Sequence, residues 1–330
     1  GQEIARAKAP GRTKVVFCPI DFGPCVRATM NLLAPSRLVD FETELWPNML
    51  SSASKRGMRL ALVNSRISDK SFRGYRRFRF FFAPVLRCFD LVCAQTRLDA
   101  DRLTAIAPDV ADRVSVCGNI KFDQPPPSGD GFDFRSLFGC DCTVLIAAST
   151  HDPEEVLIAD AFSVLKREFP RLRLVLVPRH AERGADLEKM LKAKGLSYLR
   201  RSCGSSSGSP FDVLLADTTG ELASLIKGSD LVVMGKTLAG NSEGQNIIEP
   251  AVMDKPIVCG RRLRNFRQAL DILVKADAVR RVMDDSELVD ALRSLLRDPE
   301  AARAMGRRAG DVMRASRGAL ERTLSALRGE

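Results

Sequence analysis

The sequence lacks several features that define whole classes of protein. No apolar run approaches the roughly 18 to 20 residues that a membrane-spanning helix needs. Residues 1–8 contain no apolar signal region, so we expect no secretion signal there. The nine cysteines form no C-x-x-C pair and only Cys140 and Cys142 lie close together, which argues against a disulfide framework and a zinc site. Most cysteines, such as Cys18, Cys93 and Cys259, are expected to be core residues in a reducing cytoplasm.

Length and charge indicate what is present instead. A chain of 330 residues with 45% hydrophobic content predicts two globular domains. The formal charge of +10 indicates an acidic partner, which could be nucleic acid, anionic lipid or a phosphorylated substrate. Basic and aromatic residues interleave between residues 71 and 88, which is typical of a helix on a membrane surface and also of a core helix with a solvated arginine face. These residues are Phe72, Arg73, Tyr75, Arg76, Arg77, Phe78, Arg79, Phe80, Phe81 and Phe82.

Strand-like runs alternate with amphipathic helical segments along the whole chain, a pattern that predicts parallel βαβ units. The first half predicts strands at 14–19, 37–42, 60–64, 91–95 and 114–117, and helices at 25–33, 47–55, 71–88 and 98–106. The second half predicts strands at 143–148, 173–178, 213–216, 231–234 and 256–259. Its expected helices lie at 154–168, 182–194, 266–273, 285–296 and 299–327, with short ones from Gly220 and Asn246. A Pro/Gly-rich stretch separates the halves, so we predict domains at 1–123 and 143–330 joined by a linker at 124–142.

Polar residues cluster at the expected carboxyl ends of strands, where open α/β sheets bind ligands. Glu42 and Glu44 follow one strand together with the only tryptophan, although acids in a first helical turn would also explain them. Arg179 follows Pro178 at the end of another strand, where it suits a bidentate phosphate contact or is a surface arginine. Glu249 lies one turn after Asn246, on the same helical face.

Colinear sequence blocks carry a family resemblance. The first are Glu42-Thr43-Glu44-Leu45-Trp46-Pro47-Asn48, Val63-Asn64-Ser65-Arg66-Ile67-Ser68, Ser71-Phe72-Arg73-Gly74-Tyr75 and Gly118-Asn119-Ile120-Lys121-Phe122-Asp123. The later ones are Ala148-Ser149-Thr150-His151, Leu176-Val177-Pro178-Arg179-His180, Ala216-Asp217-Thr218-Thr219-Gly220-Glu221-Leu222 and Gly244-Gln245-Asn246-Ile247-Ile248-Glu249-Pro250. From about residue 14 to about 268 the chain resembles the 3-deoxy-D-manno-octulosonic acid (Kdo) transferases, which glycosylate the lipid A precursor from CMP-Kdo.

The resemblance implies a GT-B fold: two doubly wound Rossmann-like domains facing each other across a cleft, the N-terminal one incomplete. It implies inverting, metal-independent transfer without a cofactor, at the cytoplasmic face of the inner membrane, with no nucleic-acid partner. Glu42 and Lys121 match positions thought to stabilise the transition state. The positions that match the CMP contacts are Pro178, Arg179, Thr219, Gly220, Glu221, Asn246, Ile247, Ile248 and Glu249.

Three departures from the family pattern keep alternatives open. Met234-Gly235-Lys236-Thr237 replaces a Gly-rich stretch, and Glu243-Gly244-Gln245-Asn246 replaces Gly-Gly-His-Asn. The family's opening βαβ units, which hold its acidic general base, are expected to be absent, so we expect the 330-residue chain to bind nucleotide without transferring Kdo. The alternatives are an inactive nucleotide-binding fragment or paralogue of the family, and another GT-B enzyme that uses a UDP-sugar.

Overall fold

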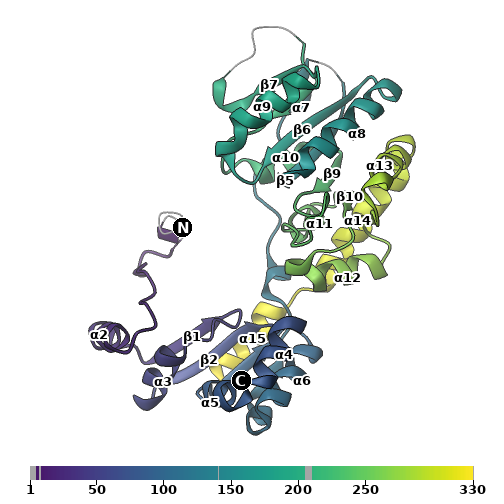
Figure 1. Cartoon of the computed structure of the whole chain (residues 1–330). Coiled ribbons are helices and arrows are strands. Elements are labelled where there is room, and N and C mark those ends of the chain that lie inside the picture. Colours follow the sequence, from purple (N-terminus) through teal and green to yellow (C-terminus); the bar gives the residue numbers. More distant parts are fainter. Residues whose placement is uncertain (1–4, 7–8, 140, 205–209, 330) are drawn as a thin grey trace. The chain divides into compact units, whose positions relative to one another are not determined.

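The computed structural model divides the chain into two compact units. It describes residues 5–6, 9–139, 141–204 and 210–329. The first unit comprises Gly1–Asp123 and Arg317–Glu330, and the second comprises Gln124–Ser316. Figure 1 colours the first stretch purple to blue and returns to the first unit with the yellow helix α15.

The first unit contains a parallel four-stranded sheet in the order β1-β2-β3-β4. Its strands are β1 (Arg37–Phe41), β2 (Arg59–Ser65), β3 (Leu91–Ala94) and β4 (Val114–Val116). Its helices are α2 (Gly23–Leu33), α3 (Pro47–Lys55), α4 (Asp69–Arg77), α5 (Arg79–Leu86), α6 (Arg97–Ile106) and α15 (Ala319–Arg328), with short 3-10 turns η1 (Pro108–Arg113) and η2 (Ile120–Asp123). Leu50, Leu62 and Leu103 are fully buried where helices α3 and α6 pack on this sheet.

The last helix departs from the predicted domain organisation. We expected residues 143–330 to form one domain, but α15 belongs to the first unit. Ala326 and Leu327 pack against Val63 and Cys93 of the four-stranded sheet. The carboxylate of Asp123 accepts hydrogen bonds from the amides of Gly318 and Leu320, at 2.5 and 2.6 Å, and so caps the start of the helix.

The predicted strand at 14–19 is wrong. These residues form no strand, and the side chains of Val16 and Phe17 are 58% and 77% exposed. Cys18, which we expected in the core, is exposed as well, whereas Cys93 and Cys259 are buried. An apolar run becomes a strand only when a neighbouring strand pairs with its backbone, and within the described residues β1 pairs with β2 alone.

The predicted continuous helix at 71–88 is two helices, α4 and α5, which meet at Phe78. Phe72 and Tyr75 of α4 and Phe82 of α5 pack against the core of the first unit, and the ring centroids of Tyr75 and Phe82 lie 4.1 Å apart. The break falls at Phe78, whose φ and ψ of −104° and 36° are not helical, and Pro84 inside α5 disfavours a continuous helix through the turn before it. Phe78 and Phe81 stay about half exposed, and Phe80 is 77% exposed.

The second unit contains a parallel seven-stranded sheet in the order β11-β10-β9-β5-β6-β8-β7. Its strands are β5 (Thr143–Thr150), β6 (Leu172–Pro178), β7 (Tyr198–Arg200), β8 (Val213–Leu215), β9 (Leu231–Met234), β10 (Ile257–Cys259) and β11 (Arg280–Arg281). Strand β5 pairs with β6 on one side and with β9 on the other. Strands β6 to β8 therefore extend the sheet to one side of β5, and β9 to β11 extend it to the other, so the strand order reverses at β5. Such a reversal opens a crevice at the carboxyl ends of the strands.

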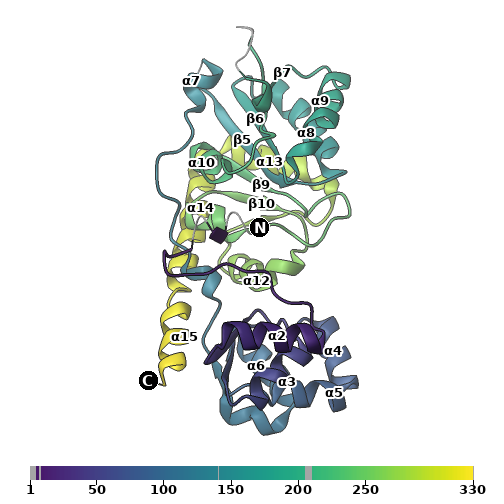
Figure 2. The same cartoon turned by 90° about the vertical axis from the view of Figure 1, so that its left-hand side faces the viewer.

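Helices cover the seven-stranded sheet (Figures 1 and 2). They are α7 (Phe134–Phe138), α8 (Glu154–Glu168), α9 (Gly184–Ala193), α10 (Leu222–Gly228), α11 (Ile248–Val252), α12 (Arg267–Lys275), α13 (Leu288–Arg297) and α14 (Pro299–Ala315), with short 3-10 turns η3 (Ala181–Arg183), η4 (Arg201–Cys203), η5 (Arg264–Phe266) and η6 (Asp285–Glu287). Leu145, Phe162 and Val233 are fully buried between the sheet and these helices. None of the helices built from described residues is long and apolar enough to cross a membrane.

Part of the predicted linker at 124–142 is ordered structure of the second unit. The amide of Phe132 donates to the carbonyl of Ser224 at 2.9 Å, and Phe134 in α7 is buried. The composition suggested a linker, but the hydrogen bond from Phe132 to Ser224 anchors the residues after its Pro/Gly stretch to helix α10.

Candidate functional site

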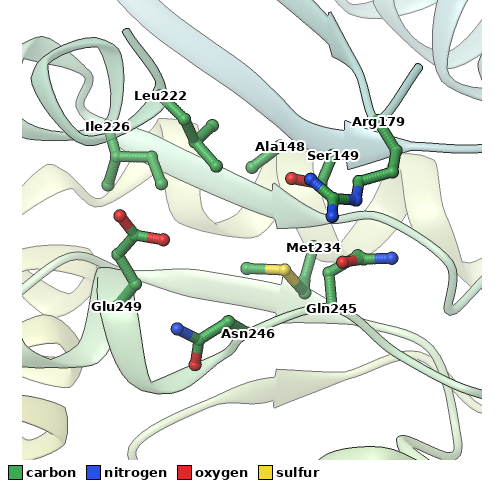
Figure 3. Close-up of a pocket in the computed structure, with 9 residues that line it drawn as sticks. All are labelled: Ala148, Ser149, Arg179, Leu222, Ile226, Met234, Gln245, Asn246 and Glu249. Atoms are coloured by element: carbon green, nitrogen blue, oxygen red, sulfur yellow. The ribbon is translucent and has the colours of Figure 1, made fainter. Parts of the chain in front are cut away.

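A pocket of about 200 Å³ lies at the carboxyl ends of β5, β6 and β9, where the strand order reverses. Figure 3 shows its lining side chains, which come from strand ends, helix α10, helix α11 and the segment that leads into α11. The lining residues are Ala148, Ser149, Arg179, Leu222, Ile226, Met234, Gln245, Asn246 and Glu249. The pocket therefore combines an apolar part with a few polar groups, as small-molecule sites do.

Arg179 brings positive charge to this pocket. It directly follows β6, and its amide donates to the carbonyl of Thr150 at 3.0 Å, which fixes its backbone beside β5. Within the described part of the chain its guanidinium group forms no ion pair. A guanidinium group with free donors at a strand end suits a phosphate oxygen.

Glu249 approaches the pocket from helix α11 (Figure 3). Burial raises the pKa of this carboxyl group above its usual value. In the described residues no hydrogen bond or ion pair satisfies its oxygens. A half-buried carboxylate of this kind gains free energy when hydroxyl groups of a ligand donate to it.

The loop between β9 and α11 closes on itself and thereby positions the polar lining residues. The amide of Gly244 donates to the carbonyl of Lys236 at 2.9 Å, and that of Gln245 to the carbonyl of Gly235 at 3.2 Å. Gly235 is required here, because an added Cβ would lie 2.2 Å from the carbonyl oxygen of Ser149. Gln245 is consequently held against the end of β5.

Three of the predicted nucleotide-contacting residues line the pocket and the others surround it. Arg179, Asn246 and Glu249 are lining residues. Pro178, Ile247 and Ile248 are buried in the framework behind it. Gly220 has a positive φ of 91° before α10 and, with Thr219, belongs to the turn that precedes this helix.

Glu221 has a structural partner in this turn. Its carboxylate accepts from Arg201 at 2.8 Å and from the hydroxyl of Thr218, and these bonds lower its pKa. Helices α10 and α11 have seven and five residues, so their N-terminal dipoles are weak, and the guanidinium group of Arg179 is the stronger positive charge at the pocket.

Other lining residues were not among the predicted site residues. Leu222, Ile226 and Met234 form the apolar part, and their sequence pattern is that of ordinary core positions. Ser149 has a positive φ of 58°, a backbone feature that no sequence pattern revealed. Gln245 stood in a recognised block and could have been chosen for its place before Asn246.

A second polar cluster lies in the first unit, where Glu42 and Lys121 come together. The ammonium nitrogen of Lys121 lies 2.5 Å from Oε1 of Glu42, and the two side chains are 40% and 28% exposed. Glu42 follows β1, and Lys121 lies in the turn η2 that follows β4. The structure thus brings together the two residues predicted to stabilise a transition state.

Asn64 joins both halves of this ion pair. Its Nδ2 donates to Oε1 of Glu42 at 3.3 Å, and its Oδ1 accepts from the amide of Ile120, next to Lys121, at 3.0 Å. Asn64 is 1% exposed and has a left-handed φ of 53°. Glu42 and Thr43 are left-handed as well, with φ values of 66° and 70°. Such strain at a polar strand end is common at functional sites.

Comparisons with known proteins show which family and fold the chain resembles. A family model described as 3-deoxy-D-manno-octulosonic-acid transferase (kdotransferase) matches residues 1–124. A 3-deoxy-D-manno-octulosonic acid transferase of Bordetella pertussis is 33% identical over 322 residues, an alignment that covers 96% of this chain and 74% of that relative.

Two solved structures are similar to parts or most of the chain. One is the C-terminal CMP-Kdo binding domain of WaaA from Acinetobacter baumannii, 32% identical with a TM-score of 0.51, which covers 54% of this chain and 93% of that one. The other is a putative UDP-N-acetylglucosamine 2-epimerase from Listeria monocytogenes, 13% identical with a TM-score of 0.61, covering 92% of this chain and 78% of that one. At 13% identity the second likeness shows the fold alone.

The two parallel α/β units, with four and seven strands, place the chain in the GT-B fold class. The identity to the Bordetella relative and the matched family model define the family within that class. The chain belongs to the 3-deoxy-D-manno-octulosonic acid (Kdo) transferases.

Proposed function

We propose that this chain provides the donor site and the transition-state-stabilising pair of a transferase that moves Kdo from CMP-Kdo to the lipid A precursor. The observation that carries the proposal is the convergence of Arg179 and Glu249, both without an ion-pair partner among the described residues, on one pocket at the strand reversal. The similar A. baumannii domain is named for CMP-Kdo binding, and its likeness covers this half of the chain.

The pocket suits each part of a cytidine monophosphate. Arg179 would hold the phosphate, and Glu249 would accept hydrogen bonds from the ribose hydroxyls. Leu222, Ile226 and Met234 offer an apolar surface for the pyrimidine ring. Asn246 would contribute its amide group, while its Oδ1 accepts from the amide of Ile248 at 3.2 Å.

The residues around the pocket would support these contacts. We propose that Thr219, Gly220 and Glu221 shape the turn before α10 and offer backbone amides to the nucleotide. Pro178, Ile247 and Ile248 would contribute through the backbone positions next to Arg179 and Asn246, since their side chains are buried.

Transfer breaks the bond between the anomeric carbon of Kdo and the phosphate oxygen, and forms a bond from that carbon to the acceptor oxygen. The acceptor hydroxyl gives up its proton in the same step, to the family's acidic general base or, without that base, to water. The phosphate leaves with a negative charge, which Arg179 would stabilise without a metal ion. Attack from the opposite face inverts the anomeric configuration. Glu42 and Lys121 would act on the charges that develop around the sugar, with Lys121 held in place by Glu42.

The acceptor is a lipid, and the first unit offers a surface that fits an anionic bilayer. Phe78, Phe80 and Phe81 are about half exposed or more. The arginines of α4 and α5 that lie beside them, Arg73, Arg76, Arg77 and Arg79, are exposed too. We propose that this basic aromatic surface holds the protein peripherally at the cytoplasmic face of the inner membrane.

The test is transfer of Kdo, from CMP-Kdo generated in place, to the lipid A precursor, followed by mass spectrometry of the lipid. A lipid product that forms with the unmodified chain but not with the Lys121→Ala variant supports the proposed transferase activity. CMP binding with no lipid product, even when the enzyme is supplied in excess of the lipid, favours the inactive nucleotide-binding fragment or paralogue instead. Product that persists undiminished in Lys121→Ala would remove that residue from the mechanism.

A further inference from the structure

Lys236 occupies an unusual backbone position at the carboxyl edge of the seven-stranded sheet. It follows β9 after Gly235 and has a left-handed φ of 59°, a conformation that glycine adopts freely and lysine rarely. A lysine kept in such a position is a candidate for a function of its side chain.

The surrounding structure fixes the backbone of Lys236 firmly. Its amide donates to Oε1 of Glu154 at 2.5 Å, and the same carboxylate accepts from the amides of Thr237 and Leu238. Glu154 is fully buried at the start of α8. The Lys236 side chain therefore starts from a preorganised point beside the end of β5.

The charges around Lys236 leave it available to an anion. His151 follows β5, its Nδ1 lies 3.2 Å from the carbonyl oxygen of Ser149, and its ring centroid lies 5.7 Å from that of His180. The backbone amides of His151 and Lys236 donate to the same oxygen of Glu154, at 2.8 and 2.5 Å, which places the two residues near each other. The pKa of His151 is lowered, first by burial and further by the positive charge of Lys236.

The nearby acids do not neutralise Lys236. Among the described residues no carboxylate lies within 4.0 Å of its ammonium group. Glu155 forms an ion pair with Arg183 at 2.5 Å. The pKa of Glu243 is lowered mainly by hydrogen bonds from its own backbone amide and from that of Ser242. The charges of Lys236 and Arg264 lower it further.

Two cationic residues thus follow strands that end at the pocket: Arg179 is one of its lining residues, and Lys236 comes two residues after the lining residue Met234. Strand β5 lies between β6, which leads to Arg179, and β9, which leads to Lys236. Two strand spacings separate their starting points by about 10 Å. One phosphate group needs only one of them, and a donor with a second anionic group could use both.

We propose that Lys236, with His151 beside it, is a specificity-determining subsite for the carboxylate of a nucleotide-activated sugar acid. This deepens the proposed function and rests on it, because the sugar carried by CMP-Kdo is itself an acid. Neutral nucleotide sugars would leave the ammonium group without a partner. Lys236 would then favour sugar-acid donors over donors that carry a neutral sugar.

The experiment compares three ligands by calorimetry on the 330-residue chain. They are CMP, a non-hydrolysable phosphonate analogue of CMP-Kdo, and the same analogue with its carboxylate replaced by a carboxamide. We expect the carboxylate analogue to bind about tenfold more tightly than the carboxamide, the effect of one charge-assisted hydrogen bond. Lys236→Met should abolish that preference and leave CMP affinity within about twofold of the original, and Lys236→Arg should retain it.

A second variant guards against a folding defect. Lys236→Gly suits the left-handed backbone, so its melting temperature should equal or exceed that of the original chain while the preference for the carboxylate is lost. Equal binding of both analogues to the unmodified chain, or equal weakening of CMP and both analogues in Lys236→Met, would overturn the subsite while CMP binding stands. Absence of CMP binding to the unmodified chain would overturn the proposed function, and the subsite with it.

Discussion

Lys121 and Glu42 form an ion pair of 2.5 Å between the turn after β4 and the end of β1, at opposite edges of the four-stranded sheet order. Asn64, at the end of β2, contacts both partners' segments and keeps them together. The partly exposed pair is worth little to stability by itself. Its value lies in holding a positive charge at a fixed place, which is what stabilisation of a transition state requires.

Asn64 should be essential to this arrangement. Asn64→Ala removes both side-chain hydrogen bonds, leaves the amide of Ile120 without its acceptor and keeps a left-handed backbone that alanine disfavours. We expect a loss of about 2 to 4 kcal/mol in the free energy of unfolding of the first unit, measured with urea. Asn64→Gly loses the same bonds without the strain and should be about 1 kcal/mol less damaging. Equal stability of Asn64→Ala and the unmodified chain would show that the network is unimportant.

Arg179 and Glu249 should contribute directly to nucleotide affinity. Arg179→Ala and Glu249→Ala are each expected to weaken CMP binding by about 1.5 to 3 kcal/mol, the range for hydrogen bonds to charged groups. Calorimetry measures the affinity and thermal melting checks the fold. Arg303→Ala is the matched control, since Arg303 pairs with Glu300 on α14 and is exposed. A sharp fall in melting temperature with unchanged affinity would make the two residues structural.

Asp40 should make the first unit less stable as the pH rises. Burial raises its pKa from 3.8 to about 7, and one carboxylate oxygen is buried without a hydrogen-bond partner. A carboxyl group with a raised pKa in the folded state keeps its proton better when folded, so stability falls between pH 4 and 7 and levels off above. The two pKa values correspond to about 4 kcal/mol as an upper bound.

Asp40→Asn removes this titration, so its stabilising effect should be small at pH 4.5 and full at pH 8. Thermal melting of both proteins across this range tests it. Asp109→Asn is the control of opposite sign, since the hydrogen bond from Arg87 lowers the pKa of that exposed carboxyl group. A pH-independent difference between Asp40→Asn and the unmodified chain would refute the assignment.

The basic aromatic surface should bind anionic vesicles. Replacing Arg76 and Arg79 by Gln is expected to cost about 2 kcal/mol of vesicle affinity, since each arginine near an anionic surface contributes about 1 kcal/mol. Replacing Phe80 and Phe81 by Ser should weaken the part of vesicle binding that persists at high salt, because that part comes from apolar contacts. Vesicle sedimentation at two salt concentrations measures both effects. A vesicle affinity that does not change with lipid charge or salt concentration would contradict the proposal.

The sequence predicted most helices and strands of both units, because long periodic segments specify their own structure. It failed where tertiary context decides. The apolar residues at 14–19 have no strand to pair with in the described structure. The predicted helix at 71–88 is broken at Phe78, and only some of its aromatic rings pack against the core. Helix α15 could not be assigned to the first unit because its cap, Asp123, lies far away in the sequence.

The candidate site shows the same division. Arg179, Asn246 and Glu249 were predicted to meet, and they line one pocket. The pairing of Glu42 with Lys121 is new information, since the resemblance suggested their roles but not their contact. The positive φ angles of Ser149 and Lys236 have no sequence signature, because these residue types rarely adopt such angles unless the surrounding structure imposes them. Asn64 is of a type that reaches the left-handed region more readily, but its place in a buried strand gave no sign of it.

The most direct test of the account compares CMP, UDP and ADP as ligands of the 330-residue chain by calorimetry. The account predicts that CMP binds most tightly, and that Arg179→Ala and Glu249→Ala remove most of that affinity. UDP binding as tightly as CMP, or more tightly, would contradict it and would move the chain's donor site to the UDP-sugar enzymes with which it shares its fold.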